Sequence, residues 1–212
     1  MRRYFFIVEF FILCLVLPTF IIVNKLAPFM FTFLWAAAAY CWFVYRYDHK
    51  EKFREIWKWE AVNWENMKPM LIRWIFASIG MLGFIYFIDP ERMFFLVKER
   101  PHIIPFLLLM YPLLSALPQE FIFCSFFFER YKRLFRTETV MIIASALVFA
   151  YAHVLYINWV APFLSFIAGL IFATTYSKTR SLALVTIEHG LYGNVLFLVG
   201  LGWYFYGGAV AQ

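Results

Sequence analysis

Seven long apolar segments constrain the fold of this chain more than any other feature of its sequence. A run of about 18 or more apolar residues is long enough to cross a lipid bilayer as a helix. Charged residues make up only 15% of the chain, against about a quarter in soluble domains. We therefore predict an all-α, polytopic integral membrane bundle of about seven transmembrane helices, within a range of about six to eight. The predicted spans are residues 5–23, 27–45, 71–88, 103–128, 139–157, 160–176 and 182–206.

Prolines and glycines predict irregularities in two of these spans. Pro112 and Pro118 fall inside the fourth span, where we expect them to kink the helix. The glycine-rich stretch 200–208 is expected to end the last helix early.

The placement of Lys and Arg predicts the orientation of the bundle. Most of these residues lie before the first span or in the loops after the second, fourth and sixth spans. Short loops rich in Lys and Arg stay in the cytoplasm. We therefore expect a cytoplasmic N-terminus, an outside C-terminus and residence in a bacterial inner membrane. The net charge of +6 then reflects topology, and we expect no nucleic-acid partner, because no soluble basic module is present.

The largest polar segment, residues 46–70, contains tryptophans among charged residues. Trp57, Trp59 and Trp64 suit an amphipathic helix lying at the cytoplasmic membrane surface. A plain loop with anchoring tryptophans explains the same pattern equally well.

Ionisable residues inside apolar spans are costly and usually face a bundle interior or a cavity. Glu9, Glu120 and Glu188 lie in such spans, as do His153 and His189. Glu9 is close enough to the N-terminus to extend its carboxylate to the membrane surface. Glu188 directly precedes His189 and could supply a second carboxylate to the site. On a regular helix it faces elsewhere, so we expect it to pair with a neighbouring helix.

Glu120, His153 and His189 come from three different predicted helices, so they can converge only in a shared cavity. A carboxylate with two imidazoles suits general-base activation of water and stabilisation of an oxyanion. The same three side chains could hold a zinc ion. We assign no metal and expect no cofactor. A hydrogen-bond network between helices explains the same residues without catalysis.

The depth of the three residues in the membrane does not fully agree. With a rise of about 1.5 Å per residue, Glu120 and His189 lie roughly 12 and 10 Å from the inner ends of their spans. By the same rule His153 lies about 21 Å deep. A tilt, a broken fourth helix or a later start of the fifth would reconcile them.

The segments PQEFIFC, FAYAH and EHGLYGN resemble the three signature motifs of the CAAX protease and bacteriocin-processing (CPBP) family of intramembrane endopeptidases. That family shows two adjacent glutamates followed three residues later by arginine, then an aromatic residue three residues before a histidine. Its third motif is a histidine with asparagine or a similar residue four positions later. The resemblance covers about residues 111–198, which makes residues 103–212 a CPBP-like core and 1–102 a set of N-terminal transmembrane helices.

Four residues of this chain match the family motifs. Glu120 stands at the second glutamate of the first motif, Phe149 and His153 form the second motif, and His189 begins the third. The resemblance implies catalytic roles for Glu120, His153 and His189.

Three positions depart from the motifs. Gln119 replaces the first glutamate, to which the family's water-activating role is generally assigned, and Cys124 replaces the arginine. Gly193 stands four residues after His189, and Asn194 follows it. We include Asn194 among the expected catalytic residues.

The sequence thus predicts an intramembrane endopeptidase that cleaves a membrane-associated or lipid-modified peptide, with membrane lipids as its surroundings. Water would be activated by glutamate and histidine. The alternative is a catalytically degenerate membrane protein that binds a peptide, lipid or partner without cleavage. A small proton-coupled transporter has less support, since the repeated halves common in transporters are absent.

Overall fold

The computed structural model describes residues 2–48 and 53–206 and contains only helices, turns and loops in this part of the chain. Seven of its helical stretches are long and apolar enough to cross a membrane, which confirms the predicted all-α membrane fold. They are Tyr4–Val23, Ala27–Asp48, Trp64–Ile88, Pro101–Tyr131, Glu138–Tyr156, Val160–Thr179 and Leu182–Val199.

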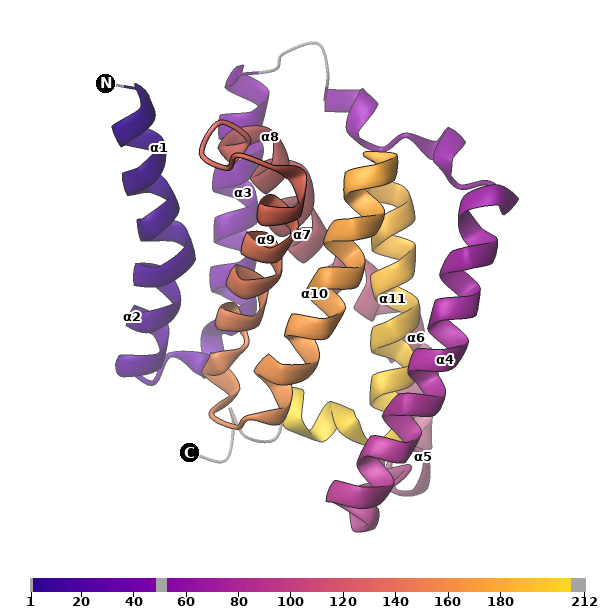
Figure 1. Ribbon diagram of the computed structural model, residues 1–212. Helices are drawn as coiled ribbons and strands as arrows, with labels where there is room; N and C mark the ends of the chain where they lie inside the picture. Colours follow the sequence, from indigo (N-terminus) through magenta and orange to yellow (C-terminus); the bar gives the residue numbers. More distant parts are fainter. Residues whose placement is uncertain (1, 49–52, 207–212) are drawn as a thin grey trace.

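The spans are built from the labelled helices of Figure 1. The first span combines α1 and α2 across the π-helical turn Ile12–Val16. The fourth combines α6, α7 and α8 across the π-helical turns Pro112–Ala116 and Phe121–Phe126. The bounds of the α-helices are α1 Arg2–Phe11, α2 Leu17–Val23, α3 Met30–Asp48, α4 Trp64–Ile88, α5 Phe95–Glu99, α6 Ile104–Tyr111, α7 Leu117–Glu120, α8 Phe127–Tyr131, α9 Glu138–Ala152, α10 Val160–Thr179 and α11 Leu182–Val199.

Helix α11 is the central element of the bundle. In its most apolar window 61% of the residues are buried, against 17% for each of the first two spans. Figure 1 shows α1 and α2 at one edge of the bundle, α4 at the other, and α10 and α11 between them. The outer helices present large apolar side chains such as Phe43, Phe76 and Phe87, as expected for a surface in contact with lipid.

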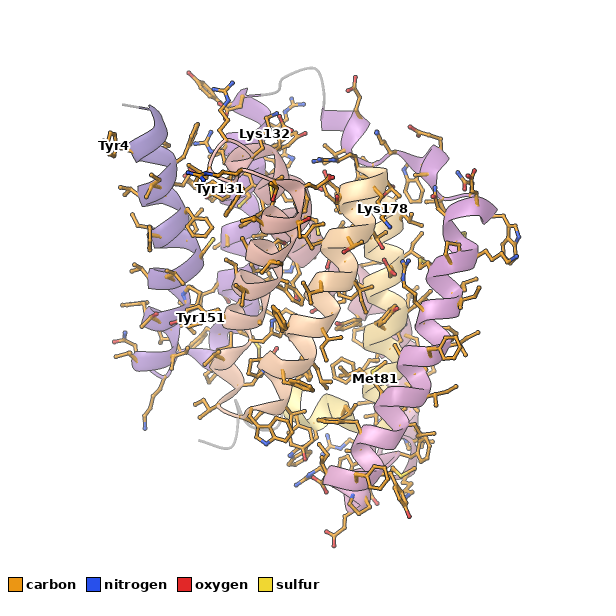
Figure 2. All side chains as sticks on the ribbon, viewed as in Figure 1. Tyr4, Met81, Tyr131, Lys132, Tyr151 and Lys178 are labelled. Carbon is orange, nitrogen blue, oxygen red and sulfur yellow. The ribbon has the colours of Figure 1, made fainter. Side chains whose placement is uncertain are left out.

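In Figure 2 Lys132 and Lys178 lie toward the same end of the bundle as Tyr4, and Met81 lies toward the other end. The loops after the fourth and sixth spans therefore lie at the end where the chain begins.

Two prolines in the fourth span leave backbone carbonyls without their helical donors. A proline has no N–H, so the carbonyl four residues earlier loses its hydrogen bond. The Leu108 carbonyl, four residues before Pro112, accepts instead from Asn194 Nδ2 at 3.2 Å. The Leu114 carbonyl, four residues before Pro118, accepts from Trp35 Nε1 at 3.1 Å.

These side-chain donors keep the fourth span helical through Pro118. The residues from Ala116 to Phe121 all have helical backbone angles, so the helix does not unwind there. A π-helical turn widens the helix on each side of α7 and changes the direction of the side chains that follow. The second of these turns is tied to α9, where Ser145 Oγ donates to the Phe123 carbonyl at 2.7 Å.

The described part of segment 46–70 forms no separate amphipathic helix. Two short 3-10 turns, Phe53–Ile56 and Trp59–Ala61, lie between α3 and α4, and residues 57–58 and 62–63 are loop or bend. Residues 49–52 lie outside the described part. The segment is fixed to α11, because Ser181 Oγ donates to the carbonyls of Trp57 and Lys58 at 2.9 and 3.0 Å.

The last helix ends before residue 206, as expected from the glycine-rich stretch that begins at Gly200. Helix α11 ends at Val199, and Gly200 follows with φ of +111°. A Cβ at this position would lie 2.0 Å from the Arg92 carbonyl oxygen, so only glycine fits. The chain then turns into a 3-10 helix, Leu201–Phe205.

Glu9 takes part in an ion pair that holds the first span against the fourth. Arg130 donates to both carboxylate oxygens of Glu9, at 2.8 and 2.9 Å, and Tyr40 donates to the same group at 2.7 Å. The carboxylate is thus paired inside the bundle instead of reaching the membrane surface.

The Trp35–Leu114 hydrogen bond gives a first prediction. Trp35→Phe leaves the Leu114 carbonyl without a donor and should lower the free energy of unfolding by about 1 kcal/mol. In a Pro118→Ala background a backbone N–H is available again, so the same substitution should cost less. A double-mutant cycle of unfolding in detergent measures the difference, and equal costs in both backgrounds would contradict this account of the carbonyl.

Candidate functional site

A cavity with a volume of about 390 Å³ lies among the transmembrane helices. His153 and His189 both line it, together with Gln119, Tyr111, Phe149 and Phe172. A smaller cavity of about 140 Å³ shares Gln119 and His153 with it and extends toward the first two spans. The two imidazoles, which come from different helices, therefore face one shared space.

Glu120 lies behind His189 and does not line either cavity. Its carboxylate Oε1 is 2.7 Å from His189 Nδ1, and its side chain is only 1% exposed. The helices approach closely here because residue 190 is glycine: a Cβ there would lie 2.9 Å from Pro112 Cγ. This bond holds one proton, carried either by Oε1 of Glu120 or by Nδ1 of His189.

The second ring nitrogen of His189 is also occupied. Tyr111 Oη lies 2.9 Å from His189 Nε2. The imidazole stacks on Phe172 with ring centroids 4.6 Å apart and planes inclined by 19°. Contacts at both nitrogens and on a ring face fix the orientation of His189.

His153 stands at the end of α9 with one ring nitrogen directed to the backbone. Its Nδ1 is 2.7 Å from the Phe149 carbonyl oxygen. A carbonyl can only accept, so Nδ1 carries the proton and Nε2 keeps its lone pair. His153 thus presents the cavity with a proton acceptor.

The Phe149 ring contacts both imidazoles, with its centroid 4.6 Å from that of His153 and 5.8 Å from that of His189. Among the described residues, no hydrogen bond joins His153 to His189 or to Glu120. His153 and His189 thus contact the same Phe149 ring and line the same cavity, although the sequence placed them at different depths.

Gln119 and Cys124 occupy two further positions of the motif. Gln119 donates through Nε2 to Ser115 Oγ at 2.9 Å, while its buried Oε1 has no partner within the described residues. Cys124 is buried and lies close enough to Glu120 for the two to interact electrostatically. Position 124 has no cationic side chain to pair with Glu120. The carboxylate of Glu120 bonds to His189 instead.

Asn194 and Glu188 are directed away from the cavity. Asn194 donates to the carbonyl freed by Pro112, as described above, so the structure does not bring it to the imidazoles. Glu188 is completely buried and pairs with Arg73 of α4, with Oε1 and Nη2 2.9 Å apart. Arg73 also donates to Thr175 Oγ1 at 3.0 Å, which links α4, α10 and α11.

Sequence reasoning did not identify Tyr111 as a site residue. A Cβ at position 193 would lie 2.0 Å from Tyr111 Cε1 and 2.5 Å from its Oη. The glycine that departs from the third motif is therefore what makes room for the Tyr111 ring. The glycine at position 193 was the one feature of the sequence that indicated this space, but it does not reveal that Tyr111 fills it.

The geometry is a poor match for a metal among Glu120, His153 and His189. Both nitrogens of His189 and Nδ1 of His153 already make hydrogen bonds. Within residues 2–48 and 53–206 no group of three or more His, Cys, Asp or Glu residues is arranged to hold a metal ion. The arrangement favours proton transfer and hydrogen bonding over coordination.

Residues 101–195 match a family model described as type II CAAX prenyl endopeptidase Rce1-like. The matched stretch covers somewhat less than half of the 212 residues and includes every residue of the site described above. Neither a curated protein nor a solved structure matches the chain.

The close approach of Tyr111 to Gly193 predicts a large effect for a single methyl group. Gly193→Ala should lower the free energy of unfolding by about 1–3 kcal/mol, because the added Cβ overlaps the Tyr111 ring. In a Tyr111→Ala background the same substitution should cost much less.

Gly83→Ala is the matched control, since a Cβ at this helical glycine meets nothing within 4 Å. It should leave stability unchanged or raise it by up to about 1 kcal/mol through helix propensity. Equal losses for Gly193→Ala and Gly83→Ala in thermal unfolding would contradict the steric argument.

Proposed function

We propose that this chain, which carries a domain of the CAAX-type intramembrane protease family in residues 101–195, is an endopeptidase that hydrolyses a membrane-associated, lipid-modified peptide. The observation that carries the proposal is the shared cavity: His153, with an available Nε2, and His189, with both nitrogens bonded, face the same space of about 390 Å³. His153 can supply a base to a substrate carbonyl in this space, while His189 is held in the wall beside it by Glu120 and Tyr111.

His153 is the proposed base. A water molecule between His153 Nε2 and Gln119 Oε1 would donate one proton toward each, which directs its lone pair into the cavity. As the water oxygen attacks the scissile carbonyl carbon, Nε2 accepts the proton. When the carbon–nitrogen bond breaks, the same proton passes to the leaving amine. The sum is one peptide and one water converted to a carboxyl group and an amine.

Glu120 is the proposed positioning residue for His189. It has no contact with the cavity, and its carboxylate is bonded to the imidazole. Gln119 is on the cavity wall, but an amide does not accept a proton at useful pH. The water-activating step therefore falls to His153, and the carboxylate next to Gln119 in sequence orients a ring instead of a water molecule.

The cavity wall suggests the substrate class. Away from the imidazoles it is formed by apolar side chains of α4 and α10, including Met81, Phe84 and Ile171. Such a wall suits an apolar side chain or a lipid attached to the peptide. The matched family description names a prenyl endopeptidase, so a farnesylated peptide ending in a CAAX sequence is the substrate to test first.

The orientation of the chain belongs to the same proposal. With the Lys-rich end of the bundle in the cytoplasm, the N-terminus lies inside. We place the protein in a bacterial inner membrane, where a lipid-modified peptide would reach the cavity from the bilayer.

A second candidate function is binding without cleavage. It is favoured by the amide at position 119, because the cavity wall then carries no carboxylate. In this case a lipid-modified peptide would occupy the cavity and remain intact.

Substitutions of His153 and Gln119 distinguish peptide cleavage from binding without cleavage. In an assay with a fluorescence-quenched farnesylated CAAX peptide and purified protein, His153→Ala should lower kcat roughly 100-fold or more, because it removes the base. Gln119→Glu should raise kcat, since it adds a carboxylate to the wall.

His102→Ala is the control, because His102 is exposed at the start of the fourth span and away from the cavity. Full activity of His153→Ala would overturn its role as base. Binding of the peptide by wild-type protein with no product formed would favour the non-catalytic candidate.

Both nitrogens of His189 and Nδ1 of His153 already make hydrogen bonds, so we expect that hydrolysis needs no metal. Treatment with 1,10-phenanthroline and removal of free divalent ions should leave kcat unchanged. A loss of activity that added Zn²⁺ restores would contradict this and bring back Glu120, His153 and His189 as metal ligands.

A further inference from the structure

Tyr111 is the one hydroxyl-bearing side chain of the described residues that joins the Glu120–His189 pair and also lines the cavity. Its Oη is 2.9 Å from His189 Nε2, and Glu120 Oε1 is 2.7 Å from Nδ1 of the same ring. Carboxylate, imidazole and phenol thus form a continuous hydrogen-bonded chain. The carboxylate end is buried at 1% exposure, and the phenol end reaches the space that a substrate would occupy.

The directions of these hydrogen bonds depend on where the protons lie. When Nε2 of His189 carries a proton, it donates to the Tyr111 oxygen. The phenolic hydrogen is then free of His189. Because Tyr111 lines the cavity, that hydrogen is available to an acceptor there.

Gly193 is required for this arrangement. Position 193 is four residues after His189, so both face the same side of α11. Any side chain there would occupy the place of the Tyr111 ring, as the 2.0 Å separation from Cε1 shows. In the motif that this region resembles, an amide side chain stands at position 193. Here a glycine stands there, and a hydroxyl from the fourth span occupies the space in front of it.

We propose that Tyr111 is a catalytic residue whose hydroxyl donates a hydrogen bond to the oxygen of the scissile carbonyl. This inference rests on the proposed peptidase function. As the water oxygen bonds to the carbonyl carbon and His153 takes the water proton, the carbonyl π electrons move to the oxygen. The Tyr111 O–H stabilises that negative charge by hydrogen bonding and keeps its own proton. When the carbon–nitrogen bond breaks, the carbonyl re-forms and the hydrogen bond weakens.

The first experiment removes only the hydroxyl. Tyr111→Phe should lower kcat for the quenched farnesylated CAAX peptide by about 10²–10³, the usual effect of deleting one oxyanion donor, with little change in KM. The variant should also lose affinity for a phosphonamidate analogue of that peptide, which mimics the tetrahedral intermediate, while it still binds the uncleaved peptide. A residue that only packs against His189 would not produce this difference.

Tyr151→Phe is the matched control. The Tyr151 hydroxyl also makes a side-chain hydrogen bond, 2.7 Å from Thr19 Oγ1, but Tyr151 is not part of the cavity wall. Tyr151→Phe should therefore keep kcat. Thermal unfolding of both variants separates loss of a hydroxyl from loss of the fold.

The second experiment exchanges the donor. Tyr111→Ala vacates the ring position and should be nearly inactive. The double variant Tyr111→Ala with Gly193→Asn places an amide N–H₂ where the phenol stood and should recover kcat at least tenfold over Tyr111→Ala. A folded double variant as inactive as Tyr111→Ala would overturn the oxyanion role, even if Tyr111→Phe unfolds.

The possible failures are distinguishable. If Tyr111→Phe keeps full kcat while His153→Ala is inactive, Tyr111 is not catalytic and the proposed peptidase stands. If wild-type protein binds the peptide but releases no product, both proposals fall together.

Discussion

The hydrogen bond between Glu120 and His189 is the interaction on which the arrangement of this site depends. A carboxylate in an apolar span must find a partner inside the protein, because lipid offers none. The three acidic residues of the predicted spans meet this requirement through side chains of other helices: Glu120 bonds to His189, Glu188 to Arg73, and Glu9 to Arg130. Each pair is therefore also a fixed point between helices.

Helix α11 is central because it carries two of these partners in succession. Glu188 and His189 are neighbours in sequence, so their side chains point about 100° apart on the helix. One reaches α4 through Arg73, and the other reaches α7 through Glu120. With α10 packed on a further face through Phe172, the position and rotation of α11 are strongly restricted. A rigid setting of this kind is what a preorganised hydrogen-bonding wall requires.

Long apolar segments made the membrane spans predictable, and the few ionisable residues within them indicated which helices meet. The sequence was a poorer guide to the roles of those residues. Glu120 and Gln119 are adjacent and point about 100° apart on the helix. The rotation of α7, which the sequence does not reveal, places the amide at the cavity and the carboxylate at His189. Asn194 was expected to take part in catalysis, but it satisfies a carbonyl whose partner was removed by a proline in another span.

No sequence pattern identifies Tyr111 as a site residue, because its role depends on a contact between two spans that are distant in sequence. The sequence shows that position 193 lacks a side chain, and the fold shows what occupies the space. Hydrogen bonds and steric gaps of this kind depend on how each helix is rotated about its axis. In spans that are apolar on most faces, the spacing of apolar residues does not determine that rotation.

The most direct test of the account is a structure of the protein with a phosphonamidate analogue of a farnesylated CAAX peptide bound. The account predicts that one phosphoryl oxygen lies within hydrogen-bonding distance, about 3 Å, of Tyr111 Oη and the other at a similar distance from His153 Nε2, with Glu120 still bonded to His189. An analogue whose phosphoryl oxygens contact Glu120 or a metal ion, or which lies outside the cavity, would contradict it.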